Sequence, residues 1–199
     1  MKQKSDSVSL RNYADGGKLM HSDMCIPCDN GLVNLRVGAI ILKDGKLLMA
    51  GNKARPSHLY SVGGRIKFGE TAKEAVIREV CEETGYRLET DRLGFVHENY
   101  FYGDADSNHG KLIYEISFYF YMKVPEDFSP VCNSHTEDGE EEFLIWIDPE
   151  DSVRYYPEFF RTEVLRSQTD VKYFVTDERE HIPAITDDRG IQSKQYLGE

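Results

Sequence analysis

Three glutamates in one short part of the chain could carry chemistry. Glu79, Glu82 and Glu83 are spaced so that a helix would place them on one face, where like charges repel by a few tenths of a kcal/mol per pair. The whole chain already has a formal charge of −11, from 24 basic and 35 acidic residues. Such crowding is typical either of a solvated acidic face or of a site that binds a cation.

The residues around these glutamates are compatible with a cation site. Glu70 precedes the expected helix and can fold back toward it, and Arg78 can anchor a carboxylate through a bidentate ion pair. The turn Gly63-Gly64 lets the backbone approach closely, so a carbonyl there could join the carboxylates. Hard oxygen ligands suit Mg²⁺ or Mn²⁺ rather than zinc. The cluster therefore suits a divalent cation, Mg²⁺ first and Mn²⁺ as the alternative, although on charge alone a solvated helix face explains it at least as well.

The elements that must position this cluster are those of a mixed α/β domain. Thr71 and Glu74 form a capping box, and Gly85 is a good terminator, so a helix is expected between them. Asp44-Gly45 predicts a hairpin turn between two β-rich segments. Strands are expected at 32–42, 46–50, 58–62, 92–102, 111–124, 143–147 and 172–176, and a second helix at 157–167. Without strict βαβ alternation, this order predicts an α/β/α sandwich around a mixed β-sheet.

Length and composition limit the class of protein. The 199 residues suit one domain, which we place at 24–180, between a flexible leader at 1–23 and a tail at 181–199. No apolar segment approaches the ~20 residues that span a bilayer, so no membrane association is expected. The acidic balance argues against a nucleic-acid partner, which would require a basic surface. Together these features predict a cytoplasmic protein with a small-molecule ligand.

The cysteines do not form a convincing metal site. There are four in the chain, and without a secretory signal they are interpreted as reduced thiols. Cys25 and Cys28 form a CxxC pair, with His21 upstream. No second ligand pair follows, so a zinc knuckle is not expected.

The spacing of the acidic cluster has a known counterpart. Gly64 is followed by five residues, Glu70, seven residues and then the segment Arg78–Tyr86 (REVCEETGY). This resembles the Nudix box, Gly-x5-Glu-x7-Arg-Glu-U-x-Glu-Glu-x-Gly-U, where U is a bulky aliphatic residue. Only Tyr86 departs from the pattern, at a packing position. The resemblance, to a bacterial branch of the Nudix hydrolases, extends from about Val33 to about Asp177.

The resemblance implies both a fold and an activity. It implies a Nudix sandwich in which the box forms a loop–helix–loop. It also implies Mg²⁺-dependent hydrolysis of a phosphoanhydride bond in a nucleoside diphosphate linked to another group X. A non-catalytic Nudix module that senses a nucleotide is the alternative, although such modules usually lose box glutamates and this box has lost none. Many members of the family are dimers, so the resemblance also allows a homodimer.

Site roles carry over from the box by position. Glu79, Glu82 and Glu83 would be the metal ligands, and one of them would activate water. Arg78 would orient Glu79, and Gly64 would lend its carbonyl to the metal.

A further acidic ligand is expected outside the box. We favour Glu140, because it belongs to the acidic segment 137–142 that precedes a strand. Glu115 is the rival, because a charge within the apolar segment KLIYEISFYF needs a partner or a face toward the site. The solvent face of an alternating strand would explain Glu115 equally well.

Four residues are predicted to bind substrate. Arg36 and Arg65 are cations near the expected site and could contact phosphate. Tyr100 and Tyr102 could stack on a base, although packing between strands would also explain them.

Overall fold

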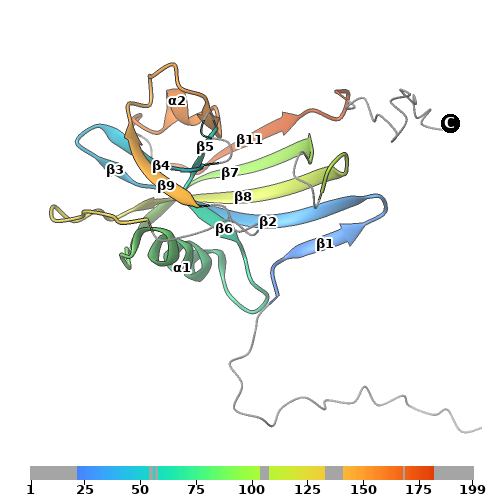
Figure 1. Ribbon diagram of the computed structural model, residues 1–199, viewed down its shortest axis with the longest axis horizontal. Helices are drawn as coiled ribbons and strands as arrows, with labels where there is room; N and C mark the ends of the chain where they lie inside the picture. Colours follow the sequence, from blue (N-terminus) through green and yellow to red (C-terminus); the bar gives the residue numbers. More distant parts are fainter. Residues whose placement is uncertain are drawn as a thin grey trace, which may run out of the picture.

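The computed structural model describes residues 22–53, 56, 58–103, 108–132, 141–167 and 169–181, and these form two packed β-sheets (Figure 1). The larger sheet has six strands: β1 (Cys25–Cys28), β2 (Gly31–Ile40), β6 (Gly63–Arg65), β7 (Thr90–Tyr102), β8 (Leu112–Met122) and β11 (Lys172–Asp177). Their order is β1-β2-β8-β7-β11, with β6 also paired to β2. The β2–β8 and β7–β11 pairs are parallel and the β7–β8 pair is antiparallel, so the sheet is mixed.

The smaller sheet has five strands and lies across one end of the larger one (Figure 1). Its strands are β3 (Leu42–Lys43), β4 (Lys46–Asn52), β5 (Leu59–Ser61), β9 (Glu142–Ile147) and β10 (Tyr155–Tyr156). Their order is β10-β5-β4-β3, and β9 pairs with β4. The chain passes from β5 directly into β6, so the two sheets meet at the start of the box.

The box helix, α1 (Ala72–Thr84), begins and ends where the sequence predicts. The Thr71 hydroxyl accepts a hydrogen bond from the Glu74 N–H at 3.2 Å, and the Glu74 carboxylate accepts one from the Thr71 N–H at 2.8 Å. Gly85 ends the helix in the left-handed conformation, with φ of 75°. The predicted capping box and terminating glycine are thus confirmed. Both could be predicted because each end of the helix depends only on neighbouring residues.

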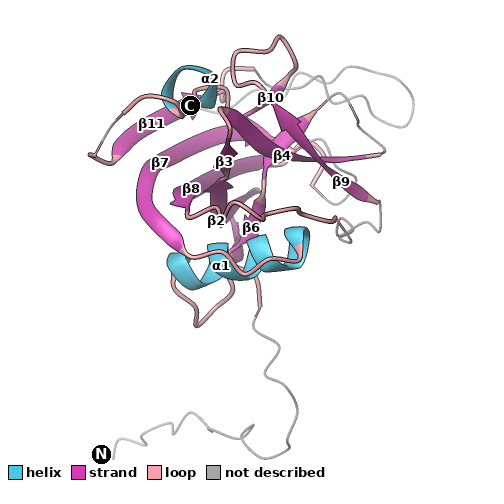
Figure 2. Cartoon of the chain, turned by 90° about the vertical axis from the view of Figure 1, so that its left-hand side faces the viewer, coloured by secondary structure: helices cyan, strands magenta, loops and turns pink. Residues whose placement is uncertain are grey.

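Strand alternation creates an apolar core on each side of the sheets. On β4, Leu48 and Ala50 face the core that α1 packs against, whereas Leu47 and Met49 face the core on the opposite side. The second core contains Phe160 of α2 (Phe160–Glu163). Figure 2 shows the two helices on opposite sides of the sheets. The predicted α/β/α sandwich with a mixed sheet is therefore confirmed.

The second helix is shorter than predicted. Sequence reasoning expects it at 157–167, whereas α2 is a single turn of four residues. Phe159 stands at its N-terminal cap and offers no side-chain acceptor to the free backbone N–H groups. The turn is stabilised by packing instead, since Phe160 is fully buried.

Several short strands were not predicted. β1, β6 and β10 contain two to four residues each and are stabilised by their partner strands rather than by a pattern of their own. Asp23, which was expected to end the leader, forms a β-bridge with Lys67 and so belongs to the folded part. The rest of the predicted leader and nearly all of the tail lie outside the described residues.

Two expectations from composition concern membranes and thiols. Among the described residues no helix is long and apolar enough to cross a membrane. All four cysteines lie within the described residues, and none of them forms a disulfide bond. Cys25 and Cys28 are three residues apart on β1, so their side chains point to opposite faces of the strand.

Candidate active site

The two glycines of β6 bring the backbone against the box glutamates. Gly63 has φ of 151°, and a Cβ there would lie 2.2 Å from the carbonyl oxygen of Val37 on β2, so only glycine fits. A Cβ on Gly64 would lie 2.5 Å from the carboxyl carbon of Glu79. The carboxylate of Glu79 therefore rests directly on the backbone of Gly64.

Arg78 binds three of the acidic residues. Its guanidinium forms a fork with Glu70, with Nε–Oε2 at 3.0 Å and Nη2–Oε1 at 2.6 Å. Its Nη1 donates to Glu79 at 2.5 Å and to Glu82 at 3.3 Å, and its Nη2 donates to the carbonyl of Arg65 at 3.0 Å. One cation thus ties the loop that precedes the helix to the acidic face of the helix.

The Arg78 fork changes the acidity of its partners. Burial works against the charge of Glu70, but hydrogen bonds from Arg78 and from the Lys67 N–H outweigh it and lower the pKa of that carboxyl. For Glu79 burial is the stronger effect, and its pKa is raised despite the contact with Arg78. The same arginine therefore stabilises one carboxylate fully and the other only in part.

Glu83 is the most buried of the box glutamates. Its relative exposure is 8%, and its Oε1 accepts a hydrogen bond from the Gly63 N–H at 2.8 Å. Burial, together with the nearby charges of Glu142 and Glu79, raises the pKa of Glu83 to about 8 despite the hydrogen bond from Gly63. A buried carboxyl that faces two other carboxyls needs a cation to hold its charge at neutral pH.

The carboxylates do not converge on one point in this structure. Among the described residues no three His, Cys, Asp or Glu side chains are grouped closely enough to hold a metal ion. The physical reason lies in their partners, since Arg78 binds Glu79 and Glu82 while Gly63 binds Glu83. The Glu82 side chain is 54% exposed and remains accessible from solvent.

Glu142 is a candidate site residue that sequence reasoning missed. It is the first residue of β9, and its charge acts on Glu83. Alternation along β9 places Glu142 on the same face as Leu144, which packs against the core that includes α1. That alternation is the signal that could have identified it. Glu140, which we favoured, lies outside the described residues.

Glu115 is paired with Arg36. The distance from Arg36 Nε to Glu115 Oε2 is 3.8 Å, and the Ser117 hydroxyl donates to Glu115 at 3.1 Å. Burial opposes the charge of Arg36, but Glu115 and, less strongly, Tyr119, Glu79 and Glu83 raise its pKa. The structure therefore brings Arg36 close to the box glutamates and gives Glu115 a partner other than a metal.

Arg65 lies beside Arg36. The two residues are paired between β6 and β2, and Arg65 forms an ion pair with Asp23 at 3.7 Å. The predicted phosphate-binding cations are thus neighbours at the edge of the box.

The two tyrosines predicted to bind a base lie elsewhere. Gly64 is level with Val96 of β7 through β2 and β8, and Tyr100 comes four residues later, about 13 Å along the strand. The Tyr100 ring stacks on Tyr114 at 4.4 Å, and the guanidinium of Arg179 lies 4.4 Å from its centre. Tyr114 is on β8 and Arg179 follows β11, and these two strands flank β7 on opposite sides.

Tyr102 belongs to the same end of the sheet. Its hydroxyl donates to the carbonyl of Arg179 at 3.3 Å. Neither tyrosine is brought together with the box glutamates.

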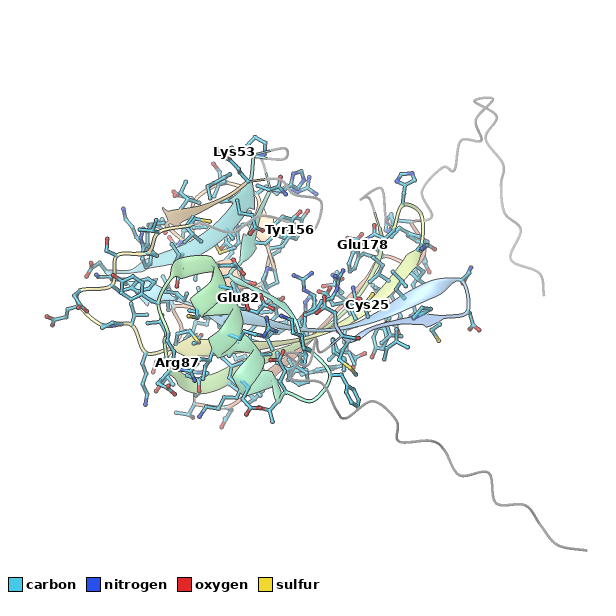
Figure 3. The ribbon with its side chains drawn as sticks, turned by 60° about the horizontal axis from the view of Figure 1, so that its bottom comes forward. Cys25, Lys53, Glu82, Arg87, Tyr156 and Glu178 are labelled. Carbon is cyan, nitrogen blue, oxygen red and sulfur yellow. The ribbon has the colours of Figure 1, made fainter. Side chains whose placement is uncertain are left out.

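The side-chain view separates these two regions (Figure 3). Glu82 lies on the box helix near the middle of the view, with Tyr156 of the smaller sheet above it. Cys25 and Glu178 mark the other end of the larger sheet, away from the helix. The acidic site therefore lies where the two sheets meet.

An α/β/α sandwich whose acidic helix follows a glycine turn defines the class of protein. The family model of the NUDIX domain matches residues 33–168, which is more than half of the chain. The chain belongs to this family and is a Nudix hydrolase, as the box spacing predicts.

Similar proteins are found among bacterial Nudix proteins. The CTP pyrophosphohydrolase of Escherichia coli (strain K12) is 28% identical over 122 residues, which cover 60% of this chain and 78% of that protein. A MutT-like protein of Streptomyces ambofaciens is 40% identical over 62 residues, which cover 31% of this chain and 40% of that protein. The crystal structure of an ADP-ribose pyrophosphatase from Streptococcus suis 89-1591 is 20% identical, with a TM-score of 0.47 over 70% of this chain and 98% of that one.

Proposed function

We propose that this protein is a Mg²⁺-dependent pyrophosphohydrolase that cleaves a phosphoanhydride bond in a nucleoside diphosphate linked to another group X. The observation that carries the proposal is the acidic face of α1, where Glu79 and Glu83 are partly or fully buried and Glu142 approaches Glu83 from β9. Carboxylates that are buried together destabilise the folded protein unless a cation neutralises their charge.

The residues present fit a hard divalent cation. Glu79, Glu82, Glu83 and Glu142 offer only oxygen donors, which Mg²⁺ and Mn²⁺ prefer. The missing Cβ of Gly64 leaves room for the Glu79 carboxylate against the backbone. We infer that these four carboxylates hold the metal, while Gly64 lends its carbonyl. A bound Mg²⁺ would supply a Lewis acid and a bound water of lowered pKa.

The other charged residues have positioning and binding roles in this proposal. Arg78 keeps Glu70 and Glu79 in place through its fork and its short contact to Glu79. Arg36 and Arg65 are the cations that reach substrate phosphate, because they are paired neighbours at the edge of the box. Glu115 holds Arg36 by an ion pair and leaves the metal to Glu142.

The substrate class follows from charge. Several cations held by clustered carboxylates can bridge neighbouring phosphates, which a diphosphate offers and a monoester does not. The net charge of −11 repels long polyanions, so small nucleotides are favoured over RNA or DNA. One similar protein is named as a CTP pyrophosphohydrolase, which supports a nucleotide substrate here. The products would be a nucleoside monophosphate and phosphorylated X.

A substrate panel tests this proposal. Nucleoside diphosphate derivatives, nucleoside triphosphates and simple phosphomonoesters are each incubated with Mg²⁺ or with EDTA, and the products are separated by ion-exchange chromatography and quantified directly. We expect turnover of at least one phosphoanhydride substrate, abolished by EDTA, and incorporation of ¹⁸O from labelled water at one of the two bridged phosphorus atoms. Turnover of monoesters alone, with diphosphate compounds untouched, would refute the assignment.

A further inference from the structure

Three aromatic rings are stacked at the edge of the smaller sheet. The His58 and Tyr156 rings are 6.3 Å apart between centres and inclined by only 5°. The Tyr60 and Tyr156 rings are 5.8 Å apart and inclined by 21°. Tyr60 on β5 and Tyr156 on β10 are direct partners in a parallel pair, so the backbone itself keeps the two rings in line.

The stack is ordered yet accessible. The Arg154 Nε donates to the Tyr156 hydroxyl at 2.7 Å, and its guanidinium lies 5.4 Å from the ring centre, so the orientation of Tyr156 is fixed. Tyr60 is 42% exposed to solvent, which is high for so large a side chain in a strand. Rigid rings that stay partly exposed lose little entropy when a flat ligand stacks on them.

Strand register places this stack on the face of the smaller sheet that carries Glu142. Tyr60 pairs with Ala50 of β4, which in turn pairs with Leu144 of β9. Residues that pair directly share a face, and residues two apart on a strand share it also. Glu142 is two residues before Leu144, so it lies on the same face as Tyr60 and Tyr156.

The stack is also close to the box along the chain. Tyr60 comes three residues before Gly63, and three extended residues span about 10 Å. The N–H of Gly63 binds the carboxylate of Glu83 at 2.8 Å. Tyr60 is therefore within the reach of a nucleotide from the acidic site, and in Figure 3 Tyr156 lies above the box helix.

We propose that Tyr60 and Tyr156 form the platform on which the aromatic base of the substrate stacks while its phosphates lie at the box. This inference rests on the proposed function and names the part of the site that recognises the nucleoside. Parallel rings offer flat π-faces that suit any base. Tyr100, by contrast, lies about 13 Å along β7 from the level of Gly64.

Steady-state kinetics on the best nucleotide of the panel provide the first test. Replacing Tyr60 by Leu removes the ring and keeps the apolar volume, and we expect KM to rise about ten-fold or more, with kcat and the half-saturating Mg²⁺ concentration unchanged. Tyr60→Phe keeps the ring and should retain a KM near that of the wild type. Tyr173→Leu removes another exposed tyrosine, 59% accessible on β11, and is the matched control. An unchanged KM in Tyr60→Leu, or an equal increase in Tyr60→Phe, would overturn the proposal.

A binding experiment tests the platform without any turnover. Saturation-transfer NMR is recorded with AMP, CMP, GMP and UMP, in the presence of Mg²⁺, and the base protons are followed. We expect saturation of the base protons of at least one of these nucleotides in the wild type, lost in Tyr60→Leu and kept in Tyr60→Phe and Tyr173→Leu. If no substrate of the panel is hydrolysed but this pattern holds, the proposed function fails and the platform stands. No saturation in the wild type, or equal saturation in Tyr60→Leu, refutes the platform whatever the panel shows.

Discussion

Glu83 on α1, which packs against the larger sheet, and Glu98 on β7, within that sheet, are both glutamates, but they have different partners. Glu98 accepts hydrogen bonds from the hydroxyls of Tyr173 at 2.7 Å and Tyr114 at 2.8 Å, and these bonds lower its pKa. Glu83 is buried, accepts one backbone hydrogen bond, and faces Glu142 and other carboxylates; burial raises its pKa to about 8.

This difference in hydrogen-bond donors distinguishes a carboxylate with a structural role from one that is suited to bind a cation. At Glu98 the protein itself supplies the donors that a carboxylate needs, so the charge stabilises the end of the sheet. At Glu83 the protein supplies too few donors to stabilise the charge, and the neighbouring negative charges destabilise it further. Perturbed acidity of this kind, caused by burial and by neighbouring charges, is typical of functional sites.

The largest expected effect is the loss of activity when Glu83 is replaced. Glu83→Gln keeps the shape of the side chain and removes the charge, and so does Glu82→Gln. We expect each to lower kcat/KM about 100-fold or more, because a metal ligand is lost. Glu98→Gln is the matched control and should stay within about two-fold of the wild type, since its carboxylate only joins two tyrosines. Wild-type turnover in both box variants would contradict the metal site.

A smaller loss is expected at Arg78. Lysine keeps the positive charge but cannot form the fork that holds Glu70. Arg78→Lys should lower kcat about ten-fold, as loss of a residue that orients metal ligands does, and leave the protein folded. Arg166→Lys is the control, because Arg166 pairs with Glu163 at 3.1 Å and its own side chain is 62% exposed. Equal activity of the two variants would show that the fork is not needed.

The acidic residue outside the box should affect the metal requirement. Glu142→Gln is expected to raise the half-saturating Mg²⁺ concentration about ten-fold, with kcat restored at saturation. Glu115→Gln should not raise it, because Glu115 binds Arg36. Glu140→Gln tests the residue favoured from sequence. A larger increase in Glu140→Gln than in Glu142→Gln would return the role to Glu140.

The smallest effect concerns stability without metal. Unfolded, Glu83 loses its proton near pH 4.5, whereas in the folded protein its pKa is about 8. Between these values the folded state binds more protons, so stability falls as pH rises, and the loss is complete above pH 8. In EDTA the wild-type melting temperature should therefore drop by several degrees from pH 5 to pH 9.

Two variants check the origin of that drop. Glu83→Gln has no proton to lose, so it should show a shallower decline and melt above the wild type at pH 9. Glu98 has a lowered pKa, so its contribution is present at high pH and is lost only as pH falls; Glu98→Gln should keep the decline. Parallel curves for Glu83→Gln and the wild type would assign the decline to other groups.

Much of the site was predictable because it is local. The helix α1, its caps and the common face of Glu79, Glu82 and Glu83 depend on spacings of three and four residues, which one helical turn determines. The role of the glycine turn was also predictable, since only glycine lets the backbone approach so closely.

Other predictions failed because they concern partners that are distant in sequence. Tyr100 looked suited to base stacking, but strand pairing places it away from the box, where its ring contacts Tyr114 and Arg179. The expected second helix is only one turn long, because no side chain caps it and it is stabilised by the burial of Phe160 and by other contacts with distant residues.

The sequence by itself determined the family, the acidic helix and the alternation of its strands, because these follow from periodicity and fixed spacing along the chain. Only the tertiary structure decided that Glu142 approaches Glu83 and that Tyr156 aligns with Tyr60. Both contacts depend on the register between strands that are far apart in the chain. Register is set by which faces are buried in the assembled sandwich, and no local segment carries that information.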